Sequence, residues 1–307
     1  MSWQPRQEIE LVAGTPAGGG QDRPARALLQ VLESRGLIDV PARLTNIPGR
    51  GGGNAWDYLA RHPGDPHVVA INSPTIITNR QLGVSDFDDR ALTPLATLYT
   101  EYIAFLVRAD SPLADAAALL ARLRDPAAIT IAMATARGNT NHMALAQLAR
   151  HGGADPRGLA LHVFDSARYA VADLLEGKAE AAAITAVSAA PELAAARLRA
   201  LAVSAPQRLG QLYADTPTWQ ELGVDCVIGT WRGVIGAAGL GAEQIAWWEN
   251  ALGKAVASAA WRDELRRQYW LDTWAGPAAT RDLLERERGM LGDLLAGLAL
   301  RASDDPS

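Results

Sequence analysis

A glycine-rich segment near the start of the chain has the composition of an anion-binding loop. Residues 14–22 read Gly-Thr-Pro-Ala-Gly-Gly-Gly-Gln-Asp and separate a strand-like segment from a helix-like segment that ends at Gly36. Such a loop exposes backbone N–H groups at the start of a helix, where the helix dipole favours a negative charge. The segment lacks the lysine and the glycine spacing of nucleotide-binding loops, so a nucleotide is not expected. Asp22 is expected to cap the helix and not to touch a ligand.

Two more loops of this kind follow in the first part of the chain. Residues 48–54 read Pro-Gly-Arg-Gly-Gly-Gly-Asn, and residues 72–75 read Asn-Ser-Pro-Thr, each after a strand-like segment. Ligands of open α/β sheets bind outside the carboxyl ends of the strands. We therefore expect the three loops to converge on a ligand, with plain turn chemistry as a close alternative for the second loop.

A fourth candidate loop lies in the middle of the chain. Residues 135–142 read Thr-Ala-Arg-Gly-Asn-Thr-Asn-His and offer hydroxyl, amide and N–H donors without a carboxylate, which suits the capture of an anion. The same residues describe a helix start with Asn139 or Thr140 as N-cap, and both interpretations can hold together. His142 has no histidine or acidic partner at metal-ligand spacing, so we expect it to pack or to form a hydrogen bond.

Arg232 stands within an otherwise apolar, strand-like segment, residues 226–239. An arginine is costly to bury unless it is paired. The side chain therefore either reaches solvent or faces an anionic ligand, and the residues alone leave both alternatives open.

The sequence carries no motif that points to an enzyme. It contains no HExxH, GxSxG or zinc-ligand spacing, and its glycine-rich loops hold no pair of acids. An active site should expose an acid, a base or a nucleophile there. Cys226 is the single cysteine, so it forms no internal disulfide, and we expect it to be a buried packing residue. The pattern favours binding without chemistry.

Charge and hydropathy exclude two further classes of protein. The net charge of -5 argues against a nucleic-acid binder, because phosphate neutralisation needs clustered cations. No apolar run reaches the roughly 18 residues of a membrane-spanning helix, and the first residues lack the apolar stretch of a secretion signal. Neither a membrane span nor an export signal is visible, and the chain is compatible with a mature form that carries an added Met.

The elements that must position these loops alternate between strand and helix. Three strand–turn–helix units fill residues 8–83, two apolar strands are expected at 92–99 and 102–109, and the alternation restarts at 111 and continues to 208. Such alternation predicts parallel sheets covered by helices. Helices without intervening strands are expected at the positions that follow: 241–258, 260–271 and 277–300.

The return strand near residue 230 suggests that the chain forms two domains and crosses between them twice. We expect a first lobe of residues 1–101 and 235–307, which includes the C-terminal helices, and a second lobe of residues 102–234. Two α/β lobes joined in this way usually hold a ligand cleft. The predicted fold class is therefore α/β, with a mixed or parallel sheet flanked by helices in each lobe.

The order of these motifs resembles that of the extracytoplasmic solute receptors of the tripartite tricarboxylate transporters, the Bug family. The resemblance covers nearly the whole chain and rests on this series of segments: AGTPAGGGQDRPAR, NIPGRGGGN, INSPTIITN, ATARGNTNH, LRALAVSAPQRL, DTPTWQELGV and TWRGVIGAAGL. It implies a periplasmic-binding-protein-like flytrap fold, no cofactor, no catalysis and a small carboxylate as ligand.

The resemblance also assigns ligand-binding residues. It implies that main-chain N–H groups, hydroxyls and bridging waters of the first, third and fourth loops hold a carboxylate. The residues carried over are Thr15, Ala17, Gly18, Gly19, Ser73, Thr75, Thr135, Gly138, Asn139, Thr140 and Asn141.

This chain departs from the family pattern at three places. Residues 163–167 stand where many members have a PYKGG-like segment, which adds Ser166 to the candidates. Ala183-Ile184-Thr185 stands where many have an FDN-like segment. The loss of that aspartate disfavours an amino-acid ligand, and Thr185 becomes the candidate. Arg232 replaces an aromatic residue of many members, which suggests a second carboxylate on the ligand.

The function that the resemblance implies is a passive periplasmic receptor, exported with a signal peptide that this sequence does not show. It would present a di- or tricarboxylate or an aromatic acid to the permease subunits of a tripartite transporter. A ligand-sensing receptor for a partner such as a sensor kinase is the alternative, and an enzyme that acts on a small acid is a further one.

Overall fold

The described part of the chain forms two compact units. The computed structural model describes residues 3–300, whose internal contacts divide them into two units. The first unit extends to Thr100 and resumes over Trp231–Gly292, and the second holds Glu101–Thr230 and resumes at Asp293. No helix of the described chain is both long and apolar enough to cross a membrane.

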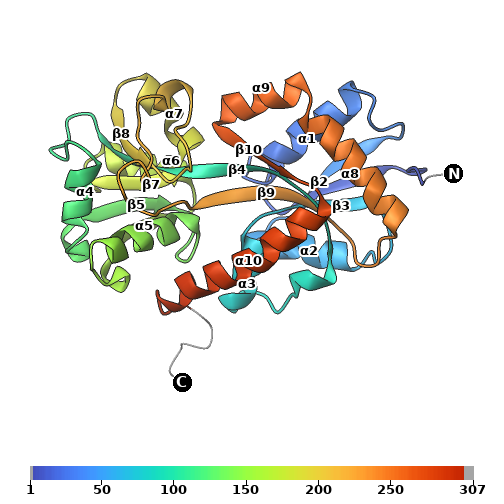
Figure 1. The fold of residues 1–307 in the computed structure, drawn as a ribbon, viewed down its shortest axis with the longest axis horizontal. Coiled ribbons are helices and arrows are strands. Elements are labelled where there is room, and N and C mark those ends of the chain that lie inside the picture. Colours follow the sequence, from blue (N-terminus) through green and yellow to red (C-terminus); the bar gives the residue numbers. More distant parts are fainter. Residues whose placement is uncertain (1–2, 301–307) are drawn as a thin grey trace. The chain divides into compact units, whose positions relative to one another are not determined.

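In the first unit, three parallel strands bring their carboxyl ends to one edge. The strands β2 (Ala42–Asn46), β1 (Ile9–Ala13) and β3 (Val68–Asn72) pair in this order (Figure 1). The strand β9 (Gly229–Gly236) pairs antiparallel with β3. All residues of β1 and β3 are buried, because helices cover both faces of the sheet. The loops after β1, β2 and β3 therefore start from the same edge.

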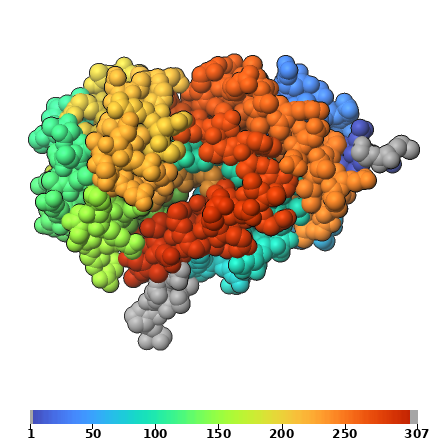
Figure 2. Space-filling model, in the orientation of Figure 1, coloured from blue at the N-terminus to red at the C-terminus, as the bar shows by residue number. Residues whose placement is uncertain are grey.

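Helices cover this sheet in two groups. The helices α1, α8 and α9 pack on the face that carries Ile9, Leu11 and the larger apolar core, and α2 packs against β1 and β3. Figure 2 shows α8, α9 and α10 at the surface of the first unit. The bounds of the helices are α1 (Asp22–Ser34), α2 (Gly53–Ala60), α3 (Thr75–Gln81), α8 (Ala242–Val256), α9 (Ala259–Gln268) and α10 (Pro277–Ala296).

The second unit repeats the plan with its own mixed sheet. The strands β6 (Ala160–Phe164), β5 (Thr130–Ala134) and β7 (Ala181–Thr185) run parallel in this order. The strand β4 (Thr93–Arg108) begins in the first unit, and its residues from Glu101 onward belong to the second, where they pair antiparallel with β7 and with β8 (Leu198–Val203). The helices are α4 (Ala116–Arg122), α5 (Thr140–His151), α6 (Ala167–Leu175) and α7 (Ala186–Ala194). The predicted α/β class with mixed, helix-flanked sheets is confirmed.

The predicted break inside β4 is wrong. The segments 92–99 and 102–109 were expected to be separate strands, but Thr93–Arg108 forms one strand of 16 residues. The polar pair Thr100 and Glu101, which lies between the two expected segments, is buried within the strand. The Thr100 hydroxyl lies 2.9 Å from that of Thr273, so its polar group is satisfied there.

A second correction concerns the C-terminal part, where helices without strands were expected. The strand β10 (Trp270–Ala275) lies between α9 and α10 and pairs with β4. Trp270 stacks on Tyr99 of β4 with ring centroids 3.8 Å apart. This aromatic contact favours the extended backbone over the helical continuation predicted to residue 271. The helix α7 was not foreseen either.

The expected domain division differs from the observed units at the C-terminal end. All of 235–307 was assigned to the first lobe, whereas the described residues from Asp293 onward group with the second unit. Gly297 lies directly against the guanidinium of Arg150 in α5, which ties the end of the chain to that unit. Residues 301–307 lie outside the described residues.

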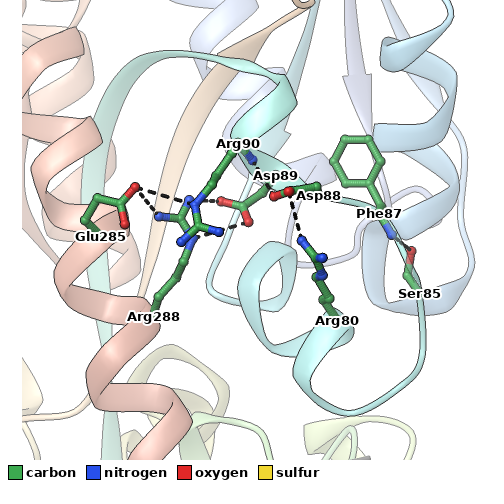
Figure 3. Close-up of polar contacts among 8 residues, drawn as sticks. All are labelled: Arg80, Ser85, Phe87, Asp88, Asp89, Arg90, Glu285 and Arg288. Atoms are coloured by element: carbon green, nitrogen blue, oxygen red, sulfur yellow. Dashed lines mark hydrogen bonds and ion pairs between the residues drawn. The ribbon is translucent and has the colours of Figure 1, made fainter.

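An ion-pair cluster anchors α10 within the first unit. Arg288 of α10 pairs with the buried carboxylate of Asp89 and with Glu285, which lies 2.6 Å away (Figure 3). The neighbouring Asp88 pairs with Arg80 of α3 at 2.9 Å. The α10 backbone also accepts a hydrogen bond from Gln81 at the end of α3. These contacts join α10 to the segment that leads into β4.

Candidate functional site

The three glycine-rich loops of the first unit lie against one another. A Cβ atom on Gly14 would lie 2.5 Å from the Gly52 Cα, so no side chain fits at this crossing of the first and second loops. The Thr75 hydroxyl of the third loop donates to the Gly51 carbonyl of the second at 2.8 Å. The three loops therefore contact one another within this unit, while their convergence on a ligand stays a prediction.

The first loop is closed by bonds between its own groups. The Gln21 side chain accepts from the Gly14 N–H at 2.8 Å, and Gly19 donates to the Pro16 carbonyl at 2.9 Å. The Thr15 hydroxyl accepts from the N–H groups of Gln21 and Asp22, both at 3.2 Å. The first-turn N–H groups of α1 are thus largely used inside the protein.

Asp22 does not act as the helix cap that the sequence suggested. It is the first residue of α1, and within the described chain its carboxylate binds a loop amide instead of an α1 amide: Oδ2 accepts from Gly18 N–H at 2.8 Å. Arg26 donates to the same oxygen, and Asn46 donates to Oδ1 at 2.9 Å. Burial raises the pKa of this carboxyl, but the bonds from Arg26, Gly18 and Asn46 outweigh it and hold the pKa below its usual value.

The candidate residues of the first loop differ in what they can offer. Ala17 and Gly18 are exposed, whereas Thr15 and Gly19 are half-buried. Gly18 and Gly19 already donate their N–H groups to Asp22 and Pro16. In the part of the chain that the structure describes, the loop amides without a partner are therefore those of Thr15, Ala17 and Gly20.

In the third loop, the candidate hydroxyls form a short chain. Ser73 Oγ lies 2.8 Å from Thr75 Oγ1, and Ser73 is buried. Asn72 precedes them at the end of β3 and is fully buried, yet neither its Oδ1 nor its Nδ2 has a hydrogen-bond partner among residues 3–300. A buried unpaired amide of this kind destabilises a fold by about 1–3 kcal/mol unless water or ligand satisfies it.

Arg232 is buried, with 9% of its surface exposed, so the alternative in which it reaches solvent is wrong. Its Nε donates to the Gly20 carbonyl at 3.1 Å, and its Nη1 donates to the Trp231 carbonyl at 3.4 Å. The guanidinium thereby supports the end of the first loop. Contact with a ligand stays a prediction.

In the second unit, the fourth loop begins with a strained residue. Thr135 has φ of 71°, a left-handed conformation that is rare for a β-branched side chain. Its N–H donates to the Phe164 carbonyl at 2.7 Å. Asn139 is the N-cap of α5, as one of the two interpretations predicted: its Oδ1 accepts from His142 N–H at 3.0 Å, and its Nδ2 donates to the Ala134 carbonyl.

His142 hydrogen-bonds within this loop, in agreement with the sequence-based expectation. Its Nδ1 accepts from the Gly138 N–H at 2.9 Å, so the ring carries its proton on Nε2. Burial, and to a smaller extent the charge of Arg137, lowers the pKa of His142 to about 4. The ring is therefore neutral at physiological pH, and Gly138 does not have a free N–H.

The start of α5 keeps several N–H groups unused. Within the described residues, no hydrogen-bond partner exists for the backbone N–H groups of Ala136, Arg137, Asn139, Thr140 and Asn141. The Thr140 hydroxyl lies 2.6 Å from that of Thr230. Asn141 Nδ2 makes a long contact of 3.5 Å to the Ala134 carbonyl. This helix start has the donors that an anion needs, without a neighbouring carboxylate in the loop.

Ser166 and Thr185 follow the strands that flank β5. Ser166 is the N-cap of α6, and Thr185 is the N-cap of α7. The Thr185 hydroxyl lies 2.9 Å from that of Ser188. Because β6, β5 and β7 are parallel, both residues lie at the same edge of the sheet as the fourth loop.

The structure adds residues that sequence reasoning left out. The second loop joins the others through Gly51 and Gly52, although plain turn chemistry was a close alternative for it. Asn72 was quoted only as part of a loop, and its signal was a polar amide directly after four apolar strand residues. Thr230 contacts Thr140, but nothing in its local sequence indicated this.

Potential metal-ligating side chains are not clustered in the described part of the chain. Over residues 3–300, no group of three or more His, Cys, Asp or Glu side chains has metal-binding geometry. Cys226 is a buried packing residue, as predicted, and burial raises the pKa of its thiol to about 12.

A surface hollow of about 580 Å³ lies along α1 and β2, lined by residues such as Leu29, Glu33 and Leu44, which belong to none of the four loops.

The fold and the loops define a class of protein: a solute-binding protein with two α/β units, each presenting N–H and hydroxyl donors after parallel strands. The family model of the tripartite tricarboxylate transporter family receptor matches residues 35–286. The chain therefore belongs to this receptor family, and the resemblance drawn from its sequence is confirmed.

Individual relatives agree with this assignment. The chain is 27% identical, over 97% of its length and 88% of the relative, to the UPF0065 protein in the tcbD-tcbE intergenic region of Pseudomonas sp. strain P51. A ligand-free TctC solute-binding protein from Polaromonas is 26% identical with a TM-score of 0.78, covering 95% of this chain and 99% of that one. Rpa4515 of R. palustris, solved with adipate, is 22% identical with a TM-score of 0.82, covering 96% and 98%. The periplasmic-binding-protein type of fold is thus confirmed.

Proposed function

We propose that this receptor captures a small carboxylate in the periplasm and delivers it to the permease of a tripartite tricarboxylate-type transporter. The ligand class is a di- or tricarboxylate or an aromatic acid. The observation that carries the proposal is the row of unpaired N–H groups at the start of α5, in a loop without a carboxylate. Such a row stabilises a bound anion.

The proposed ligand contacts combine these amides with hydroxyl and amide groups of the other loops. The fourth loop binds the charged carboxylate, because it has the larger number of unused N–H groups. The first and third loops contribute fewer amides and more hydroxyls. The proposed contacts are Thr15, Ala17, Gly18, Gly19, Ser73, Thr75, Thr135, Gly138, Asn139, Thr140, Asn141, Ser166, Thr185 and Arg232.

The receptor releases its ligand unchanged in this proposal. Its family consists of transporter receptors, and adipate, the molecule solved with Rpa4515, is a dicarboxylate. The carboxylate of Asp22, which is buried beside the first loop, is engaged by hydrogen bonds and carries a lowered pKa. A general acid or base would instead need a pKa near the working pH.

A thermal-shift screen tests the proposal. Mono-, di-, tri- and aromatic carboxylates are added to the purified protein, and a ligand at about 100 times its Kd stabilises the folded state by roughly 2.7 kcal/mol. A rise in Tm of a few degrees with a carboxylate supports the receptor. Mass spectrometry of the denatured protein identifies any copurified ligand. No shift in protein freed of ligand contradicts the proposal, and turnover of the added acid contradicts passive binding.

A further inference from the structure

The carboxylate of Asp22 joins three segments of the first unit. Asp22 lies at the start of α1, and its side chain is 0% exposed. Oδ2 accepts from the Gly18 N–H in the first loop and from Arg26 Nε one turn along α1, both at 2.8 Å. Oδ1 accepts from Asn46 Nδ2 at 2.9 Å, and the same Asn46 nitrogen donates to the Thr15 carbonyl at 2.8 Å. One buried anion therefore fixes the middle of the loop and, through Asn46, its beginning.

The arrangement requires two accepting oxygens. Gly18 and Arg26 donate to one oxygen of Asp22, and Asn46 donates to the other. An asparagine at position 22 has only one accepting oxygen, and its NH₂ group would face a donor on the other side. The substitution therefore disturbs the loop even though it preserves shape and volume.

The bond to Gly18 also decides which loop amides remain available. Gly18 has φ of 79°, and a Cβ atom placed on it would meet no other atom within 4 Å, so packing does not fix its backbone. Its N–H is turned inward to Asp22, while Ala17, directly before it, and Gly20, two residues after it, keep N–H groups without a partner in the described chain. Releasing Gly18 would let these neighbouring peptides rotate.

We propose that Asp22 is a positioning residue, which holds the first loop in its ligand-binding shape before a ligand arrives. The inference rests on the proposed function for its effect on binding, because the ligand is taken to be a carboxylate. Asp22 does not touch that ligand. Because Asp22 orders the loop before binding, the loop loses less conformational entropy when the ligand binds, which is the usual benefit of a preorganised site.

The test compares Asp22→Asn with the wild-type chain in two measurements. Isothermal titration gives the Kd for the tightest carboxylate of the thermal-shift screen, and amide hydrogen exchange followed by NMR reports the protection of Gly18. We expect Kd to rise about tenfold, the equivalent of one lost hydrogen bond to a charged group, and Gly18 exchange to accelerate by a similar factor. The Ala25 amide in α1, which donates to the Gln21 carbonyl, should keep its protection and shows that the helix is intact.

Arg26→Gln is the matched control. It removes the charge partner of Asp22, but the Arg26 side chain is 59% exposed and the carboxylate keeps its bonds to Gly18 and Asn46. Kd and Gly18 exchange should stay within about twofold of wild type, because exposed ion pairs contribute little. If Asp22→Asn does not fold, Asn46→Ala replaces it and should raise Kd about threefold through loss of the link to Thr15.

The possible results distinguish a failure of the positioning role of Asp22 from a failure of the proposed function. A raised Kd with faster Gly18 exchange in Asp22→Asn, and neither in Arg26→Gln, supports the positioning role. A Kd within twofold of wild type, or unchanged Gly18 exchange, overturns it. If the wild-type chain binds no carboxylate, the proposed function fails, and the exchange of Gly18 alone then decides whether Asp22 shapes the loop.

Discussion

The first and fourth loops look alike in sequence but are held by opposite means. In the first loop, the buried carboxylate of Asp22 takes the Gly18 N–H, and the amides at the start of α1 are used internally. In the fourth loop, the neutral groups of Asn139 and His142 hold the chain, and the amides at the start of α5 stay unpaired within the described residues. A glycine-rich turn before a helix is therefore not by itself an anion site. Such a turn can bind an anion only where its N–H groups are not already hydrogen-bonded within the protein.

A similar contrast exists between buried carboxylates of the first unit and the buried polar side chains of the fourth loop. The first unit buries Glu10, Asp22 and Asp89, each beside an arginine. The fourth loop of the second unit buries the uncharged Thr140, Asn141 and His142. Acid should therefore act on Glu10 and Asp22 in a different pH range from the fourth loop, because their pKa values are lowered from different usual values.

The largest expected effect comes from breaking the ion pair of Asp89 with Arg288. Asp89→Ala leaves Arg288 of α10, which has only 15% of its side chain exposed, without its buried partner, so that the exposed Glu285 remains as its ion-pair partner in the described chain. Removal of one member of a buried pair typically destabilises by about 3–5 kcal/mol. Urea unfolding at pH 7 measures the loss.

A matched change at an exposed pair, Arg157→Ala beside Asp155, should alter stability by less than about 1 kcal/mol. Equal losses in both variants would contradict the assignment.

The second-largest expected effect is a pH dependence of folding stability that comes from His142 in the fourth loop. The pKa of His142 is about 4 in the folded chain, against about 6.5 when unfolded, so between these values the unfolded chain binds more protons. Stability from this residue is complete above pH 6.5 and decreases as the pH falls toward 4, by on the order of 3 kcal/mol.

His142→Asn checks this dependence, because an asparagine can still accept from Gly138 but does not titrate. Unfolding free energies at pH 7 and pH 4.5 are compared for both chains. The variant should lose less stability than wild type over this interval. Parallel curves for the two chains would show that His142 is not the titrating group. The lowered pKa values of Glu10 and Asp22 place the corresponding loss in the first unit below their usual values, at more acid pH.

A smaller effect is expected at the cap of α5. Asn139→Ala removes the acceptor of the His142 N–H and the donor to the Ala134 carbonyl, and caps of this kind contribute about 1 kcal/mol. Thermal unfolding should show this loss without a change in the transition's cooperativity. Asn139→Asp keeps the accepting oxygen and serves as the control, and a loss as large as that of the alanine variant would argue against a capping role.

The smallest stability change is predicted at Asn72. Its amide is buried without a partner in the described chain, and Leu has the same branching at Cγ, with methyl groups in place of the polar atoms. Asn72→Leu should be neutral or stabilise the ligand-free protein by up to about 1 kcal/mol, because it removes an unsatisfied polar group. Chemical denaturation without ligand gives the result. A loss above about 1 kcal/mol would mean that Asn72 is hydrogen-bonded in solution.

The sequence predicted the α/β class and the strand–loop–helix order, because apolar runs and glycine turns are local signals. It also gave Asn139, with Thr140 as the alternative, as the cap of α5, and His142 as a packing or hydrogen-bonding residue. It could not predict that β4 continues through Thr100, since the partner Thr273 is far along the chain. The internal use of the Gly18 N–H by Asp22 was equally invisible. Such outcomes depend on tertiary hydrogen bonds, which leave no periodic trace in the sequence.

Calorimetry with a carboxylate and its neutral amide tests the central claim most directly. The tightest acid of the screen and its fully amidated analogue have similar size and shape but differ in charge. Saturable binding of the acid, with at least about tenfold weaker binding of the amide, is the result expected from N–H groups that await an anion. Equal binding of both compounds, or binding of neither this acid nor any other carboxylate to ligand-free protein, would contradict the account.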